Sequence, residues 1–199
     1  MMEPLFGTFL DPKPPIRSPQ LTAALLARAL GITEKAASPW LLPMQYALMY
    51  AQLNTVNRLA AFLAQIGHES GSFKWLSEIW GPTAAQSRYQ THPKLGNKQP
   101  GDGYRYRGRG LIQITGRGNY RAITLALKPQ GCPDFEANPD ALSEPQWAAL
   151  SAAAFWRDHS LNTLADVEDT LGITHVVNGG ENGLDDRIAR FKRAKEALS

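Results

Sequence analysis

The stretch from Leu59 to Glu69 constrains the fold more than any other part of the chain. Apolar side chains recur in it one helical turn apart, at Leu59, Phe62 or Leu63, and Ile66. This spacing is typical of a helix with one buried face. The sequence therefore predicts a core helix that ends at Glu69, with the glutamate continuing the face that packs inward.

The position of Glu69 suggests a chemical role. A carboxyl group at the rim of an apolar face is poorly solvated, which favours its protonated form. A carboxylic acid that keeps its proton near neutral pH can protonate a leaving oxygen as a general acid. The alternative is an ordinary glutamate at a helix end that turns to solvent.

Composition excludes several classes of protein. The chain has 199 residues, 43% of them hydrophobic, which suits one globular domain with a sizeable core. It has no apolar run of 18 residues, so we expect no transmembrane helix. Residues 1–9 lack the pattern of a secretory signal. The single cysteine, Cys132, leaves no internal disulfide and fits synthesis in a reducing compartment.

Net charge and the spacing of histidine and cysteine residues indicate which ligands the chain is expected to bind. The net charge of +3 and the isoelectric point near 9.1 are compatible with an anionic polymer or an envelope surface. The four histidines are widely spaced and cysteine pairs are absent, so we expect no metal site and no cofactor. The segment 108–110 lacks the lysine of a phosphate-binding loop. Nucleic-acid binding rests on the basic isoelectric point alone, and we expect none.

The remaining patterns predict one mainly α-helical domain spanning residues 1–199. Residues 1–17 carry four prolines and are expected to form an irregular N-terminal arm. Helices are expected from Ser18-Pro19 to Gly31, from Ser38-Pro39 to about Tyr50, from Asn54 or Thr55 to Glu69, from Tyr120 to Leu127, from a capping box at Ser143 to about Asp158, from Ala165 to Leu171, and from Leu184 to Leu198.

Residues 104–115 are predicted to form one small β-hairpin after a turn-rich stretch from Gly81 to Gly103. A stretch of that length inside a compact domain is expected to be a functional loop. On the second strand, Gln113 and Thr115 share a face because alternate residues point the same way. Their amide and hydroxyl can orient a sugar hydroxyl or a water molecule. The alternative is a plain hairpin with a polar outer face.

Glu78 follows Glu69 by nine residues and has Trp75 and Trp80 nearby. Two carboxylates that flank a cleft are the working parts of most glycoside hydrolases. One protonates the glycosidic oxygen, and the other activates water or attacks the sugar. Solvated surface glutamates also occur at this spacing, so the pair alone leaves both interpretations open.

Two residues near the C-terminus are further candidates. Asn178 precedes two glycines, where it can present its amide to a sugar N-acetyl group or simply form a turn. Arg187 borders the buried face of the last helix, where a semi-buried arginine is expected to pair with a carboxylate. Three cations of that helix are interpreted either as a weak contact with anionic envelope lipid or as a solvated face: Lys192, Arg193 and Lys195.

Taken together, the motifs resemble the family 19 chitinase-like glycoside hydrolases, especially their phage and prophage endolysin branch. The resemblance covers roughly residues 59–198. It rests on four segments in order: IGHES at 66–70, YRGRGLIQIT at 106–115 with Asn119-Tyr120, VNGG at 177–180, and DRI at 186–188. It implies a lysozyme-like, two-lobed, α-helical fold around a substrate cleft.

The resemblance also implies roles for single residues. Glu69 matches the general acid, Glu78 falls where the endolysin branch carries its general base, and Thr115 matches a hydroxyl that helps to hold the attacking water. Arg187 matches an arginine that supports the acid, with Glu181 as another partner for it. The residues expected to bind substrate are His68, Gln113, Asn119, Asn178 and Arg187. Family members of the chitinase type invert the anomeric centre.

The leading interpretation is a peptidoglycan-degrading endolysin that hydrolyses the β-1,4 bond between N-acetylmuramic acid and N-acetylglucosamine. Chitin is also an N-acetylated β-1,4 polymer, so a chitinase is one alternative. A lytic transglycosylase, which segments 69–73 and 110–113 also resemble, and a non-catalytic cell-wall binding module are the others. We expect a monomer, made in the host cytoplasm without a signal peptide, that acts on peptidoglycan in the periplasm after release.

Overall fold

The computed structural model describes residues 21–90 and 92–199. Helices supply nearly all of their regular structure, in the order α1 (Ala23–Leu30), α2 (Glu34–Ala37), η2 (Ser38–Trp40), α3 (Leu41–Tyr50), α4 (Val56–Glu69), α5 (Ala84–Ser87), η3 (Pro93–Leu95), α6 (Asp102–Arg105), α7 (Arg117–Leu127), η4 (Lys128–Gln130), η5 (Pro139–Ser143), α8 (Pro145–Asp158), α9 (Leu161–Asp166), α10 (Thr170–Asn178) and α11 (Leu184–Leu198). The predicted mainly α-helical class is confirmed. The predicted N-terminal arm and the helix start at Ser18-Pro19 lie outside the described residues.

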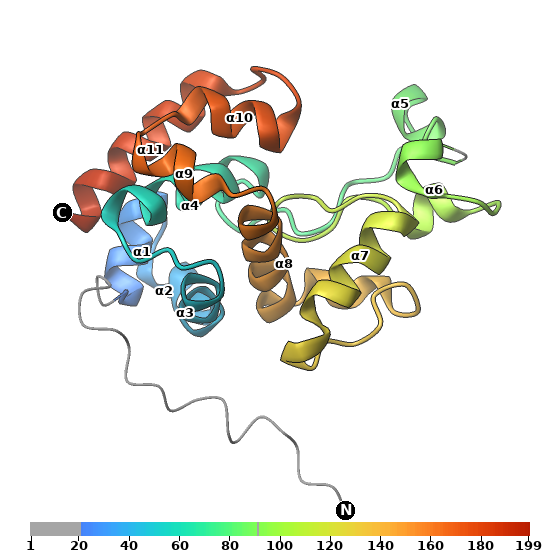
Figure 1. The fold of residues 1–199 in the computed structure, drawn as a ribbon, viewed down its shortest axis with the longest axis horizontal. Coiled ribbons are helices and arrows are strands. Elements are labelled where there is room, and N and C mark those ends of the chain that lie inside the picture. Colours follow the sequence, from blue (N-terminus) through green and yellow to red (C-terminus); the bar gives the residue numbers. More distant parts are fainter. Residues whose placement is uncertain (1–20, 91) are drawn as a thin grey trace, which may run out of the picture.

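Helix α8 connects two groups of helices. Figure 1 shows it between α1, α3, α4 and α11 on one side and α7 on the other, with α5 and α6 at the end of the molecule away from α10 and α11. Each group has its own hydrophobic cluster, and α8 contributes to both: Ala148 and Ala152 to the first, Trp147 and Leu150 to the second. The two-lobed arrangement around a cleft stays a prediction.

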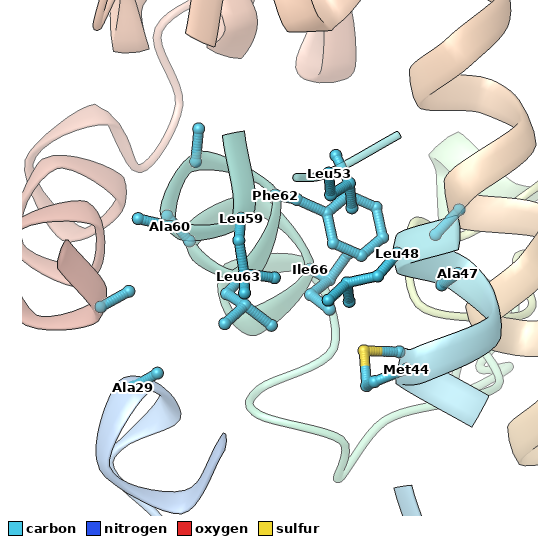
Figure 2. Packing of buried hydrophobic residues seen from close by; sticks show 14 of the residues in the cluster. Ala29, Met44, Ala47, Leu48, Leu53, Leu59, Ala60, Phe62, Leu63 and Ile66 are labelled. Atoms are coloured by element: carbon cyan, nitrogen blue, oxygen red, sulfur yellow. The ribbon is translucent and has the colours of Figure 1, made fainter. Parts of the chain in front are cut away.

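Helix α4 is the helix predicted from the apolar run, and it lies deeper than a one-sided stripe requires. It begins after Thr55, whose hydroxyl accepts the backbone N–H of Arg58 at 3.2 Å. Residues 59–67 are all buried, because α1, α9 and α11 pack around the helix. Figure 2 shows its apolar side chains inside this cluster. Glu69, the last helical residue, is partly exposed, whereas Ser70 and Phe73 after it are buried again.

The strands of the predicted hairpin over residues 104–115 do not form. Tyr104 belongs to α6, and residues 110–113 form a turn in which Gln113 has a left-handed φ of 55°. The β structure of the described residues consists of two isolated antiparallel bridges, which join Arg109 to Ile114 and to Ser77. The prediction failed because residues 102–105 close a helical turn and the left-handed Gln113 interrupts the extended backbone that the second strand requires.

Buried polar groups, rather than extended strands, order the turn-rich stretch from Gly81 to Gly103. The Asp102 carboxylate accepts the backbone N–H groups of Lys98 and Gln99 at 2.8 and 3.0 Å and pairs with Arg117 at 2.6 Å. The hydrogen bond from Arg117, assisted by the two N–H groups, lowers the pKa of Asp102 to about 2 against the opposing effect of burial. These bonds fix the chain at the start of α6.

Helix α8 begins where predicted, but its first turn is not closed by the expected capping box. Glu144 occupies the cap position and makes no hydrogen bond there with its side chain. The Ser143 hydroxyl instead donates to the carbonyl oxygen of Leu76 at 3.0 Å. Ser143 therefore fastens the start of α8 to the segment that follows Glu69.

The short helix predicted at 165–171 is wrong, because a helix boundary falls inside that range. Helix α9 ends at Asp166, and α10 begins at Thr170. The Asp169 carboxylate accepts the backbone N–H of Gly172 at 2.7 Å and so caps α10. Helix α11, by contrast, has the predicted bounds. Across residues 21–90 and 92–199, no helix combines the length and apolar character needed to span a bilayer.

Candidate active site

Glu69 lies at the C-terminal end of α4 beside a buried arginine. Arg187 of α11 has no exposed surface, and its guanidinium pairs with Glu69 and donates a second hydrogen bond to Gln65. The Glu69 side chain remains 18% exposed, so its carboxylate is held from the protein side and open to solvent on the other. The predicted pairing of Arg187 with a carboxylate is confirmed.

Glu69 is surrounded by polar groups, whereas the sequence predicted a carboxyl group at the edge of an apolar helix face. The face ends in a polar group of three, in which Gln65 is 1% exposed and also reaches Thr174 of α10 at 3.5 Å. The planar fork of an arginine binds two acceptors in a fixed geometry, so Arg187 sets the orientation of the Glu69 carboxylate. The sequence prediction missed Gln65, although its position one turn before Glu69 could have identified it.

His68 is used inside the protein. Its Nδ1 lies 2.7 Å from the Asp186 carboxylate, which also accepts a hydrogen bond from Arg190 at 2.6 Å. Burial raises the pKa of Asp186, but the bonds from Arg190 and His68 outweigh it and the pKa is lowered. A methyl group on Gly183 would come within 2.1 Å of the imidazole. His68 therefore joins α4 to the start of α11, and its contact with substrate stays a prediction.

Glu78 lies outside any helix and is held by neutral groups. The backbone N–H of Gly108 donates to its Oε2 at 3.0 Å, and the Gly108 carbonyl accepts the Glu78 N–H at 2.8 Å. Gln86 Nε2 donates to Oε1 at 3.0 Å, and the Tyr89 hydroxyl lies 3.5 Å from the same oxygen. Burial raises the pKa of Tyr89, and the charge of Glu78 adds to that effect, so the phenol remains a donor.

Gln86 and Tyr89 were not among the predicted site residues. Gln86 also accepts the backbone N–H groups of Gly81 and Thr83, and with the Thr83 hydroxyl it forms a capping box for α5. Thr83 followed three residues later by Gln86 is a signal that the sequence contains. The prediction missed it because the stretch was read only as a loop.

Gly108 lies between the candidate base and two other predicted residues: its backbone binds Glu78, and the side chains of Gln113 and Thr115 lie beside it. A methyl group on Gly108 would lie 2.7 Å from Gln113 Oε1 and 3.3 Å from the Thr115 hydroxyl, so a larger residue would displace the Gln113 side chain. The Thr115 hydroxyl donates to the Gln113 carbonyl at 2.9 Å, and Asn119 donates to the Thr115 carbonyl at 2.7 Å. The structure therefore groups these predicted residues, but a turn does so rather than a shared strand face.

Asn178 has no hydrogen bond to the other predicted residues. It is exposed and ends α10, and Gly179 follows in the left-handed conformation with φ of 80°. It lies one turn beyond Thr174 and therefore on the α10 face that meets Gln65. Its contact with a sugar stays a prediction. Glu181 lies 3.5 Å from His175, so the idea that it pairs with Arg187 is wrong.

The two carboxylates thus lie in unlike surroundings. Glu69 faces a buried guanidinium, whereas none of the cations in the described residues lies within ion-pair distance of Glu78. The described part of the chain also contains no group of three or more metal-ligating side chains. The chemistry that this arrangement offers is proton transfer by two glutamates near a hydroxyl and several amides.

Comparison with known proteins places these residues in a family. No protein-family model matches the chain. A glycosyl hydrolase family 19 domain-containing protein of Haemophilus influenzae is 32% identical in an alignment of 166 residues, and the match covers 69% of this chain and 79% of that protein. An endochitinase of Arabidopsis thaliana is 38% identical over 125 residues, 62% of this chain and 39% of that one. The chain thus spans well under half the length of the plant enzyme.

The fold agrees with these relatives. The crystal structure of chitinase C from Streptomyces griseus HUT6037 superposes with a TM-score of 0.63 and 20% identity, covering 89% of this chain and 91% of that one. At 20% identity the superposition shows a shared fold. Membership of the family is shown by the 32% identity with the Haemophilus protein. The chain belongs to glycosyl hydrolase family 19 and is a glycoside hydrolase.

Proposed function

We propose that the protein is a peptidoglycan hydrolase of the phage or prophage endolysin type, which cuts the β-1,4 bond between N-acetylmuramic acid and N-acetylglucosamine. The observation that carries this proposal is the placement of Glu69, whose partly exposed carboxylate is oriented by the fully buried Arg187. A carboxyl group fixed by a rigid support and open to solvent on one side is suited to act on a bound polymer.

In the proposed reaction the two glutamates exchange protons with the substrate. Glu69 gives its proton to the glycosidic oxygen as the bond from that oxygen to the anomeric carbon breaks. Glu78 takes a proton from the water whose oxygen forms the new bond to the same carbon. The Thr115 hydroxyl already donates to a carbonyl, so its oxygen is left to accept a hydrogen bond from that water. The resemblance to chitinases implies inversion.

The substrate class has separate support. The chain carries a net charge of +3 and one cysteine, which suits an anionic cell-wall polymer and a protein made without disulfides. His68, Gln113, Asn119 and Asn178 remain the proposed substrate-binding residues, and Asn119 and Asn178 are exposed. The prediction that Arg187 also binds substrate is wrong, because the side chain is fully buried and acts through Glu69.

A chitinase is the second candidate, and it is favoured by the plant relative, whose name is endochitinase. A lytic transglycosylase and a binding module are less favoured, because the chain is a glycoside hydrolase of family 19. The transglycosylase reaction needs one acidic residue and no water, and it would leave Glu78 without a role.

Incubation of the protein with murein sacculi and with glycol chitin tests the proposal. We expect loss of turbidity of the sacculi, release of new reducing ends and no anhydro sugar. Anhydro ends would identify a transglycosylase. Activity on glycol chitin with none on sacculi would identify a chitinase and overturn the proposed substrate.

We also propose that the protein acts as a monomer and reaches the periplasm after synthesis in the host cytoplasm. Contact with envelope lipid has less support than the glycan, because Lys195 pairs with Glu168 and Arg193 donates to the carbonyls of Ala29 and Leu30. Charge reversal at Lys192, which makes no such bond in the described residues, should leave lysis of intact cells unchanged. A large loss would favour a lipid contact.

A further inference from the structure

The positive charge of the chain is concentrated in the stretch that contains Glu78. Residues 71–110 carry seven arginines and lysines against two carboxylates, a net charge of +5, whereas the whole chain carries +3. Arg109 is engaged with Asp140 at 2.7 Å. The other six cations form no ion pair with any described residue. This excess positive charge favours an anionic ligand near Glu78.

Arg107, like Arg105, has its guanidinium held over an aromatic ring. Its Cζ lies 4.4 Å from the centre of the Tyr104 ring, and its Nη1 donates to the Tyr104 carbonyl at 3.1 Å. Arg107 also directly precedes Gly108, whose N–H binds Glu78 at 3.0 Å. The side chain is partly buried. It is therefore a fixed cation one residue from the backbone that orients the candidate base.

The ring beneath Arg107 belongs to an aromatic cluster that leads back to Glu78. Tyr104 packs edge-on against Trp80 with ring centres 5.6 Å apart, and Trp80 lies 6.3 Å from Tyr89. The Tyr89 hydroxyl is the group 3.5 Å from Glu78. Tyr104 nevertheless remains 53% exposed. An exposed aromatic surface and a fixed guanidinium therefore adjoin the candidate base.

We propose that Arg107, stacked on Tyr104, binds a carboxylate of the glycan beside the bond that is cut. This inference rests on the proposed cell-wall substrate. A stacked guanidinium keeps its in-plane N–H groups for paired hydrogen bonds to a carboxylate, and Arg107 uses one of them on the Tyr104 carbonyl. Peptidoglycan carries carboxylates on its stem peptides and, where the peptide is absent, on the lactyl group of N-acetylmuramic acid, whereas chitin is neutral.

The aromatic support and the free N–H groups together explain why Arg107, rather than its neighbours, would select the substrate. Arg105 also lies over a ring, that of Tyr106, but its guanidinium already donates to the Tyr106 hydroxyl and to the carbonyls of Glu136 and Ala137. An arginine held on a ring loses less side-chain freedom on binding than an unsupported one. Arg88 is exposed, and in the described residues it has no ring beneath it and no ion pair. Arg88 therefore contributes to the general positive potential, and Arg107 to recognition.

Binding measurements on matched ligands test this inference. The Glu69→Gln protein, which is expected to bind without cutting, is titrated with peptide-free muramyl glycan strands and with the same strands after amidation of the lactyl carboxylates. We expect Arg107→Gln in this background to weaken binding of the anionic strands roughly tenfold more than binding of the amidated strands. Peptide-bearing strands form a third arm. A loss confined to them would assign the carboxylate to the stem peptide.

Two controls make the result decisive. Arg88→Gln removes the same charge without the stacked geometry, and it should weaken binding of the anionic strands less than twofold. Tyr104→Ala should reproduce most of the Arg107→Gln effect because the guanidinium loses its support. Equal weakening for anionic, amidated and peptide-bearing strands, no weakening, or an equal effect of Arg88→Gln would overturn the inference. Failure of the native protein to open sacculi would overturn the proposed function, a separate result.

Discussion

The region around Glu69 and the region around Glu78 hold a carboxylate by different means. Glu69 ends a helix whose preceding residues are buried, and a guanidinium from a second helix pairs with it. Glu78 lies in an irregular segment, where one backbone N–H and one amide supply its closest hydrogen bonds. The first carboxylate is thus fixed by the packed core, and the second by a local network of hydrogen bonds.

This difference has a consequence for chemistry. A permanent cation beside Glu69 gives that carboxylate a fixed electrostatic partner. Glu78 has only neutral donors, which orient its oxygens and leave its charge unmatched by any described residue. The two carboxylates are thus oriented by unlike supports, and the roles of Glu69 as acid and Glu78 as base rest on the family resemblance. Each of the following variants acts on one side of this comparison.

Removal of Arg187 should have the largest effect. Arg187→Leu leaves Glu69 and the buried Gln65 without their shared donor, and the loss of one partner of a buried pair costs about 3 kcal/mol of unfolding free energy. Hydrolysis should fall by about 100-fold, even at temperatures where the variant is folded. Urea denaturation gives the first quantity and sugar release the second.

The matched control is Arg190→Leu, on the same helix, whose pair with Asp186 is partly exposed. Arg190→Leu should lower the unfolding free energy by about 1 kcal/mol or less. Equal destabilisation by the two variants would remove the distinction between a buried and a surface partner.

The second prediction concerns pH and the loop region. The pKa of Asp102 is about 2 in the folded protein against an ordinary value of 3.8, so the unfolded chain binds the proton first as pH falls. The carboxylate therefore contributes about 2 kcal/mol to stability at pH 6. This contribution is lost as pH falls from about 4 through 2. The difference in unfolding free energy between the native protein and Asp102→Asn should narrow over that range.

The native protein must be compared with Asp102→Asn because a second carboxylate, Glu136, also affects stability at low pH. Hydrogen bonds from Arg121 and Arg117 lower its pKa to about 2 as well, so the native protein loses stability in this range for two reasons. Only the difference from Asp102→Asn isolates one carboxylate. A difference that stays constant from pH 6 to pH 2 would show that the Asp102 pair does not form.

The third prediction weakens the support of Glu78. Gln86→Ala removes one donor to the Glu78 carboxylate and the capping contact of α5. We expect a loss of about 1–2 kcal/mol in stability and roughly a tenfold fall in kcat. Gln90→Ala is the control, because it removes loop hydrogen bonds to Gln99 and Gly103 without touching Glu78. Similar kcat values for the two variants would show that Gln86 does not position the base.

The smallest effect is expected from Tyr89→Phe. The hydroxyl lies 3.5 Å from Glu78, at the outer limit of a hydrogen bond. Stability should change by less than about 0.5 kcal/mol, and kcat by less than about twofold. A tenfold fall in kcat would reveal a direct role for the phenol and would move Tyr89 from the support to the reacting groups.

The sequence predicted the region around Glu69 better than the region around Glu78. Helical periodicity reports burial directly, so α4, α8 and α11 and the contact between Arg187 and a carboxylate could be predicted from apolar spacing. The order around Glu78 comes from contacts between the Gly108 backbone and side chains elsewhere in the chain. No periodicity records such contacts, which is why a hairpin is predicted in place of a turn. The capping-box spacing from Thr83 to Gln86 indicates a helix start but not the contact of Gln86 with Glu78.

The central claim is that Glu69 and Glu78 act as acid and base on one glycosidic bond. Its most direct test is release of reducing ends from sacculi by the native protein and by Glu69→Gln and Glu78→Gln, each first checked for an unchanged unfolding transition. Both variants should lose at least about 100-fold in rate. Full activity of Glu78→Gln, with Glu69→Gln inactive, would contradict the claim and leave a single catalytic carboxylate.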